Sequence, residues 1–272
     1  MKKVVLALLA VQALILPLAQ QGKMQKVSVV NYINSWPFYH GLLPLADKNL
    51  IAISGDNPGE CARKLSNGEV NLGLVPVAIL PKLKNCKIVS NLGIAAFGQV
   101  GSVFLFSKVP LEDIEKVYLD YQSRTSVRLL QILLKYFWKK KVEFVPASGG
   151  YEENIDGTTA GLIIGDRTFS QMSNFPYRYD LASAWAAYTG LPFVFAVWAG
   201  NRDLPDTFLA EFNQALLSGL DRRDQIINEK SSNRAYRDFL HNYLYNNILY
   251  HIGAEEKVGM ELFLQLEKKL EG

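Results

Sequence analysis

Short apolar runs with the character of β-strands alternate with segments of helical periodicity along the first part of the chain. The strand-like runs VSVVNYI, LIAIS, VNLGLVP and CKIVSNLGIAA are separated by amphipathic segments at residues 38–45 and 58–65. Such alternation is typical of α/β folds in which helices cover a parallel sheet. The pattern therefore predicts an α/β unit in the N-terminal part of the chain.

A second α/β set begins with the runs GSVFLFS and KVYLD. It continues with a long predicted helix at residues 125–139, the strands VEFVP and AGLIIGD, and a helix near residues 181–188. The apolar run PFVFAVWAG follows, and after it only helical patterns remain, from Pro205 to the C-terminus. We interpret this order as two lobes whose chain crosses over and returns. The expected divisions are lobe I at 24–109 plus 198–272 and lobe II at 110–197, with a ligand crevice between them at the ends of the strands.

Four loops at predicted strand ends carry small polar residues: NYINSWP, AFGQVGS, YQSRTS and IGDRTF. Asn31 and Asn34 are candidates for ligand contacts, although Asn34 is as well suited to cap the helix that follows it. Ser102 either satisfies a strand end or faces the crevice. Asp166 follows an apolar strand, and its position favours a helix N-cap over a polar group in the crevice.

The stretch DYQSRTSVRLLQILL places Ser123, Arg124, Thr125 and Ser126 where a helix begins. One hydroxyl is enough to cap a helix, so the surplus has a second interpretation. The free N–H groups, the positive end of the helix dipole and the Arg124 fork together could receive a carboxylate or phosphate. Residue types alone leave capping and anion binding both open.

Composition narrows the classes of function. The chain has 272 residues, 49% hydrophobic and 20% charged, which describes a globular protein of one large or two smaller domains. A net charge of +3, evenly spread, gives no indication of nucleic-acid binding. Cys61 and Cys86 lie far apart without a CxxC motif, and no glycine-rich phosphate-binding motif is present. We therefore expect no metal and no cofactor.

The N-terminus resembles a secretory signal, because Lys2 and Lys3 precede an apolar run from Val4 to Ala19. The cleavage site is poor, since Pro17 stands where a small residue is needed, and the run is short for a membrane-spanning helix. Met24 lies directly before the first predicted strand and could start a complete domain. We expect a cytoplasmic protein with residues 1–23 as an apolar leader or a misassigned start, without stable membrane association beyond that leader. Export through residues 1–23 is the alternative.

Several motifs together resemble a known family, the chorismate dehydratases of the futalosine route to menaquinone. The resemblance covers Met24 to about Asn201 and rests on NYINSWPFYHGL, NLGLVPVAIL, SRTSVRLLQILL, LIIGD and LASAWAAYTGLPFVFAVWAG. It implies a two-lobed, type II periplasmic-binding-protein-like α/β fold with an interlobe active site. Ser183 and Ala184 depart from the residues that relatives often carry.

The resemblance also implies a substrate and a reaction. Chorismate carries two carboxylates, and its dehydration removes the C4 hydroxyl and the C3 hydrogen as water, giving an aromatic product. Asn34 and Ser102 are the expected catalytic residues. The expected substrate-binding residues are Asn31, Ser123, Arg124, Thr125, Ser126 and Asp166.

No histidine, glutamate or lysine lies in the matched loops. We therefore expect the enolpyruvyl carboxylate of the substrate to accept the proton, with Asp166 in reserve. A secreted solute-binding protein and the dihydroxynaphthoate synthase of the same pathway are the alternative functions.

Overall fold

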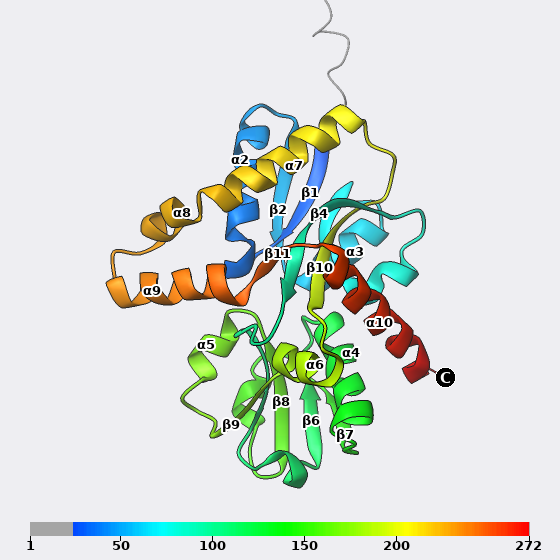
Figure 1. The fold of residues 1–272 in the computed structure, drawn as a ribbon, viewed down its shortest axis with the longest axis vertical. Helices are drawn as coiled ribbons and strands as arrows, with labels where there is room; N and C mark the ends of the chain where they lie inside the picture. Colours follow the sequence, from blue (N-terminus) through cyan, green and yellow to red (C-terminus); the bar gives the residue numbers. More distant parts are fainter. Residues whose placement is uncertain (1–23, 272) are drawn as a thin grey trace, which may run out of the picture.

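The computed structural model describes residues 24–271 as two lobes, each built on one β-sheet covered by helices (Figure 1). The first sheet has the strand order β11-β4-β10-β3-β1-β2. Its strands are β1 Gln25–Val30, β2 Ile51–Asp56, β3 Leu72–Pro76, β4 Lys87–Ala96, β10 Phe193–Gly200 and β11 Leu249–His251. The second sheet has the order β7-β6-β8-β5-β9. Its strands are β5 Val103–Ser107, β6 Lys116–Leu119, β7 Glu143–Pro146, β8 Thr159–Ile164 and β9 Tyr177–Asp180.

Helices cover both sheets. Those of the first lobe are α2 Trp36–Asp47, α3 Pro58–Ser66, α7 Asp206–Asp221, α8 Arg223–Lys230, α9 Arg234–Asn242 and α10 Ala254–Glu271. Those of the second lobe are α4 Thr125–Ile132, α5 Arg167–Gln171 and α6 Leu181–Thr189. Short 3-10 turns are η1 Ile33–Ser35, η2 Val77–Lys82, η3 Leu111–Asp113 and η5 Tyr151–Asn154, and two π-helical segments are η4 Leu133–Phe137 and η6 Tyr243–Asn247. Helix α10 runs down beside the second lobe and packs against α4 (Figure 1).

The two-lobed α/β architecture agrees with the prediction, but the sheets are mixed rather than parallel. Strand β10 runs antiparallel to both β3 and β4, and β5 runs antiparallel to both β8 and β9. Strand β5 carries the chain into the second lobe, and β10 carries it back into the first lobe. Each of these two strands therefore runs in the direction opposite to that of its neighbours. Strands β9 and β11 were not predicted, because each is short and lies beside helical sequence.

The crossings between the lobes lie earlier in the chain than expected. Strand β5 belongs to the second sheet, so the chain leaves the first lobe at residues 97–102 and not at residue 109. The whole of β10 belongs to the first sheet, so the return falls at residues 190–192. The expected boundaries are corrected accordingly, because strand pairing, which the sequence does not display, decides to which lobe a strand belongs.

One buried carboxylate fixes the first crossing. Asp180, at the start of α6, accepts hydrogen bonds from the backbone N–H groups of Ala182 and Ser183, each at 3.0 Å. The same carboxylate accepts from the N–H groups of Val100 at 3.3 Å and Gly101 at 2.8 Å. A helix cap of the second lobe thereby holds the crossing segment immediately before Ser102.

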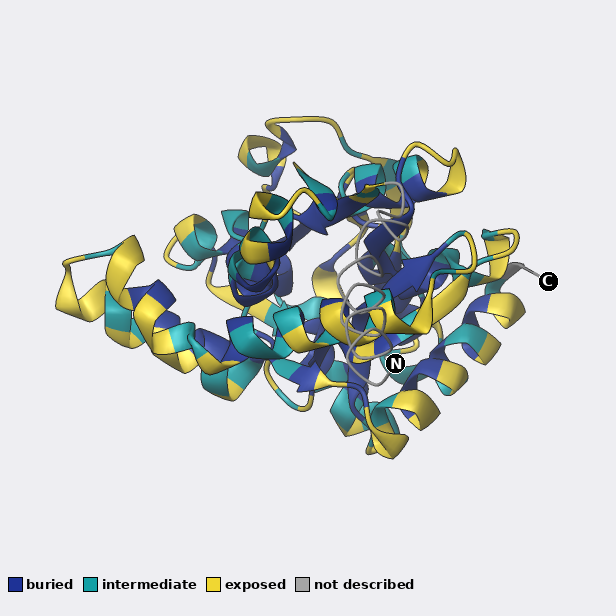
Figure 2. Ribbon diagram, turned by 90° about the horizontal axis from the view of Figure 1, so that it is seen from above, coloured by how far each residue is buried: buried dark blue, intermediate teal, exposed yellow. Residues whose placement is uncertain are grey.

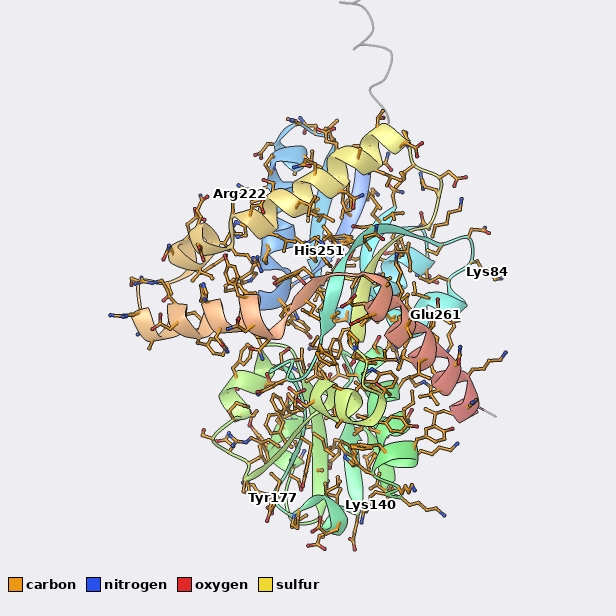
Figure 3. The ribbon with its side chains drawn as sticks, viewed as in Figure 1. Lys84, Lys140, Tyr177, Arg222, His251 and Glu261 are labelled. Atoms are coloured by element: carbon orange, nitrogen blue, oxygen red, sulfur yellow. The ribbon has the colours of Figure 1, made fainter. Side chains whose placement is uncertain are left out.

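Each sheet is buried between its helices, while the helices expose their outer faces (Figure 2). In the first lobe, α2 and α7 approach closely because glycines meet at their crossing. A Cβ atom on Gly41 would lie 2.2 Å from the carbonyl oxygen of Ala215. The charged side chains of Lys84 and Glu261 lie at the periphery of the molecule (Figure 3). Within residues 24–271 no helix is both long enough and apolar enough to cross a bilayer.

Candidate functional site

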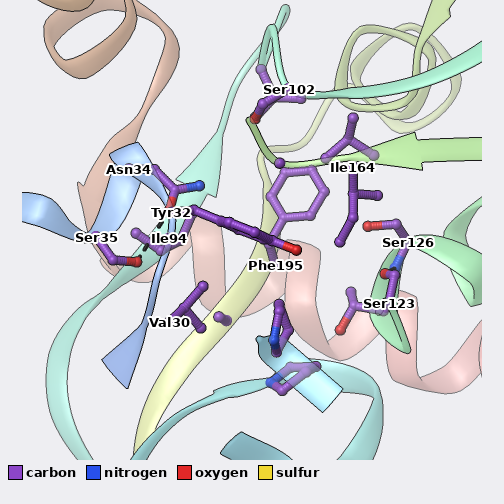
Figure 4. Close-up of a pocket in the computed structure, with 17 residues that line it drawn as sticks. Val30, Tyr32, Asn34, Ser35, Ile94, Ser102, Ser123, Ser126, Ile164 and Phe195 are labelled. Carbon is purple, nitrogen blue, oxygen red and sulfur yellow. Dashed lines mark hydrogen bonds between the residues drawn. The ribbon is translucent and has the colours of Figure 1, made fainter. Parts of the chain in front are cut away.

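A cavity of about 540 Å³, including its open mouth, lies between the lobes where the predicted loops meet (Figure 4). Its apolar lining includes Val30, Pro58, Pro76, Ile94, Val100, Val103, Ile164 and Phe195. Its polar lining consists of Tyr32, Asn34, Ser35, Ser102, Ser123, Thr125 and Ser126. Among the described residues, none that lines the cavity carries a carboxylate or a cationic side chain.

The start of helix α4 forms the wall from the second lobe, and its hydroxyls have different partners. Ser123, one residue before the N-cap position, accepts through its Oγ from the Ser126 N–H at 3.0 Å and so satisfies a free N–H group of the first turn. Thr125 Oγ1 accepts from the N–H of Ala78 at 3.2 Å and so joins the two lobes. Ser126 is 3% exposed, and its side chain lies at the edge of the cavity (Figure 4). The surplus of hydroxyls therefore serves capping, lobe contact and cavity lining, and the helix presents its positive end to the cavity.

The loop after β1 forms the opposite wall. The side-chain oxygen of Asn34 accepts from Ser35 Oγ at 3.1 Å, and its main-chain oxygen accepts from the hydroxyl of Tyr250 at 2.9 Å. These bonds leave the amide nitrogen of Asn34 on the cavity side (Figure 4). Helix α2 begins at Trp36 without a side-chain cap, so the capping alternative for Asn34 is wrong. Asn34 is instead a neutral donor to the cavity.

Ser102 closes the cavity at the crossing between the lobes. It is 1% exposed, and its Oγ accepts a hydrogen bond from the hydroxyl of Tyr243 at 2.8 Å. Burial raises the pKa of Tyr243 well above its ordinary value, so this phenol is neutral. Tyr243 was not predicted, because nothing in the helical C-terminal pattern distinguishes it from the other tyrosines there.

Tyr32 is a second residue that the sequence did not single out. Its ring lies against the backbone of Gly165, where a Cβ atom would be only 2.7 Å from Tyr32 Cζ. Its hydroxyl donates to Gln122 Oε1 at 2.5 Å, which joins the lobes across the cavity. Burial raises the pKa of Tyr32, so the ring adds a neutral phenol to the lining.

Asp166 does not line the cavity. Its two carboxylate oxygens lie 3.2 and 3.3 Å from the backbone nitrogen of Ile33, which donates to them from the other lobe. Asp166 stands at the predicted N-cap position of helix α5, but its side chain makes no capping hydrogen bond there. Burial raises the pKa of Asp166 to about 6, and the bond from Ile33 opposes that rise.

Two other predicted binding residues also lie outside the cavity. Arg124 is exposed and lines a neighbouring groove together with Arg128. Asn31 is exposed and lies beside Gly55. The expected arginine fork is therefore not part of the cavity wall. The groups left to receive an anion there are hydroxyls, an amide and backbone N–H groups.

Arg167, which follows Asp166 in the sequence, forms its ion pairs with residues that do not line the cavity. Arg167 forms an ion pair with the buried Asp120, and it donates to Glu152 at 2.6 Å. Burial raises the pKa of Asp120, and the Arg167 charge opposes that rise. Asp120 follows β6 and Arg167 follows β8, so this network joins the ends of the two strands. Within residues 24–271 no cluster of three or more His, Cys, Asp or Glu side chains could hold a metal ion.

Two α/β lobes with a cavity at their crossing define the class of periplasmic-binding-protein-like folds, and solved structures share this architecture. A structural-genomics protein from Archaeoglobus fulgidus superposes with a TM-score of 0.72 at 15% identity, covering 93% of this chain and 99% of that one. The periplasmic aliphatic sulphonate binding protein of Escherichia coli gives 0.60 at 12% identity, covering 92% and 94%. A Candida albicans protein, described as having the generic periplasmic binding protein fold, gives 0.64 at 11% identity, covering 92% and 91%. At these identities the likeness concerns the fold.

Sequence comparison identifies the family. Residues 25–269 match the family described as menaquinone biosynthesis, and the chain belongs to this family. A protein of Thermus thermophilus named chorismate dehydratase is 29% identical over 256 residues, which covers 86% of this chain and 92% of the relative. The recognition of the family from its sequence motifs is thus confirmed.

Proposed function

We propose that this protein is a chorismate dehydratase, a hydro-lyase that converts chorismate to 3-(1-carboxyvinyloxy)benzoate and water. The observation that carries the proposal is the interlobe cavity of a menaquinone-biosynthesis family member, in which neutral donors from both lobes converge. The named relative from Thermus thermophilus supports the same activity. The cytoplasm is the proposed location.

Chorismate is a dianion, and the proposed cavity binds it without cationic side chains. The first turn of α4 with Ser126, and Ser123 just before it, offer hydroxyls and the positive end of a helix to one carboxylate. Asn34 and Ser102 approach from the opposite side and the crossing, where they can orient the second carboxylate and the departing hydroxyl. Such donors are effective because the surrounding apolar wall lowers the local dielectric.

The proposed elimination uses a base that belongs to the substrate. The enolpyruvyl carboxylate takes the proton from C3, the C3–H electrons form the new ring double bond, and the C4–O bond breaks. The departing hydroxide and the abstracted proton together make the water released. The absence of carboxylate side chains from the lining, within the described residues, supports this route. Asp166 turns its oxygens to the Ile33 N–H, which favours a role in joining the lobes.

The test is incubation of the full chain with chorismate, with product formation followed by absorbance and product identity by mass spectrometry. We expect an aromatic acid one water lighter than chorismate, and loss of turnover in Asn34→Ala and Ser102→Ala. Ser107→Ala is the matched control: Ser107 is equally buried, at the other end of β5, where its Oγ accepts from the Val109 N–H at 3.1 Å. Tight binding of chorismate without reaction would favour a solute-binding protein. Lack of reaction with chorismate, together with turnover of the dihydroxynaphthoate synthase substrate, would favour that synthase.

A further inference from the structure

A buried tyrosine connects the two proposed catalytic residues. Tyr243 is 2% exposed, and its hydroxyl donates to Ser102 Oγ at 2.8 Å. The Asn34 side chain lies close enough to this phenol to lower its pKa, against the larger effect of burial. Asn34 follows the first strand, Ser102 precedes β5, and Tyr243 comes from the C-terminal helices. Three distant parts of the chain therefore bring polar side chains together at the end of the cavity.

The ring of Tyr243 is held on two sides. Phe169 of α5 meets it edge-on, with ring centroids 5.3 Å apart and planes at 80°. Phe239 of α9 lies parallel to it, with centroids 6.2 Å apart and planes at 5°. Tyr243 also begins the π-helical segment η6, a departure from α-helical geometry that is frequent at functional sites. The hydroxyl is thus carried on a ring with little freedom to move.

This arrangement decides what Ser102 can do. A serine hydroxyl has a single proton, which rotates to suit its surroundings. When Ser102 Oγ accepts from Tyr243, its own proton is free to point into the cavity that Ser102 lines. A buried, neutral phenol cannot readily supply a proton of its own, so its effect is to orient and polarise the serine.

We infer that Tyr243 is a positioning residue, which orients Ser102 and Asn34 toward the substrate and does not itself touch the reacting atoms. The inference rests on the proposed function. It assigns to the tyrosine a role in turnover and not only in packing. Removal of the hydroxyl leaves Ser102 free to turn away from the substrate, so the chemical step slows more than binding weakens.

The test is a double-mutant cycle of Tyr243→Phe and Ser102→Ala in the full chain, with chorismate as substrate. Tyr243→Phe keeps the ring and its aromatic contacts. We expect kcat to fall about tenfold, as for loss of one orienting hydrogen bond, while KM changes less than about twofold. In the Ser102→Ala background Tyr243→Phe should change kcat little, because the serine it orients is gone.

Tyr151→Phe is the control for loss of a buried phenol hydroxyl, because Tyr151 is 3% exposed and donates to Asp120 at 2.9 Å, away from the cavity lining. It should change kcat less than about twofold. A second variant, Phe169→Leu, loosens the Tyr243 ring without removing its hydroxyl. Phe169→Leu should lower kcat by a smaller factor than Tyr243→Phe, and this effect should also vanish in the Ser102→Ala background. Phe169→Leu therefore tests the inference even if Tyr243→Phe does not fold.

Three results would overturn the inference. The first is a kcat of Tyr243→Phe equal to that of the wild type. The second is a loss of kcat on Tyr243→Phe that is equally large in the Ser102→Ala background. The third is a loss of kcat that the lower stability of the variant explains by itself. A wild-type protein that forms no product from chorismate would instead overturn the proposed function.

Discussion

Replacement of Asp166 by Asn removes a partly buried charge between the lobes, while keeping the size of the side chain and one acceptor oxygen for the Ile33 N–H. Burial raises the pKa of Asp166 from 3.8 to about 6 in the folded protein. The folded state therefore holds this proton more tightly than the unfolded chain between these two values. Stability consequently falls as pH rises through the window from about 4 to about 6.

The size of the effect follows from the two pKa values. A difference of about two pH units corresponds to about 3 kcal/mol once both states are ionised. Asp166 is only partly buried, so we expect about 1–2 kcal/mol. The neutral amide of the variant resembles the protonated acid, so Asp166→Asn should raise the free energy of unfolding by this amount at pH 8. The gain should fade toward pH 4, where the wild-type carboxyl is protonated as well.

Urea denaturation of wild type and Asp166→Asn at pH 8, 6 and 4 measures the difference, and turnover of chorismate is measured on the same samples. We expect kcat within about threefold of wild type, because the carboxylate faces Ile33 and not the cavity. Loss of turnover with an intact fold would identify Asp166 as the proton acceptor. A lower stability of the variant at pH 8 would refute the argument from burial.

Three further predictions concern neighbouring features. Arg124→Ala should leave KM for chorismate within about twofold, because this exposed side chain lines the adjacent groove; a tenfold rise would restore the predicted arginine clamp. Gly165→Ala should lower the free energy of unfolding by about 2–3 kcal/mol in denaturant titrations and raise KM. Gly165 has a φ of +66°, and the Cβ atom of an alanine there would displace the Tyr32 ring. An unchanged free energy of unfolding and an unchanged KM would mean that the ring is not held against residue 165. A protein that starts at Met24 should fold and turn over chorismate like the full chain, because β1 begins at Gln25. Residues 1–23 lie outside the described structure. Insolubility of the shortened protein, or recovery of the cellular protein outside the cytoplasm, would contradict the interpretation of these residues as an apolar leader or a misassigned start.

The SRTS stretch was only partly understood from the sequence. Ser123 and Ser126 both line the cavity, although Ser123 precedes helix α4, which begins at Thr125. Arg124 and Arg128 line the outer groove, and Ser123 reaches that groove as well. The residue types suggested one clamp, whereas in the folded chain Arg124 lines the outer groove and Ser126 lines the cavity.

The amino-acid sequence by itself determined the α/β class, the two lobes, the family and a ring of small polar residues at strand ends, because each of these follows from local periodicity or contiguous motifs. Only the tertiary structure decided that Tyr243 bonds to Ser102, that Tyr32 lies on Gly165 and that Asp166 joins the lobes. It also decided the strand directions at the crossings. These features depend on contacts between segments far apart in the chain, and a side chain's direction and burial, which set its hydrogen bonds and its pKa, exist only once those segments have packed.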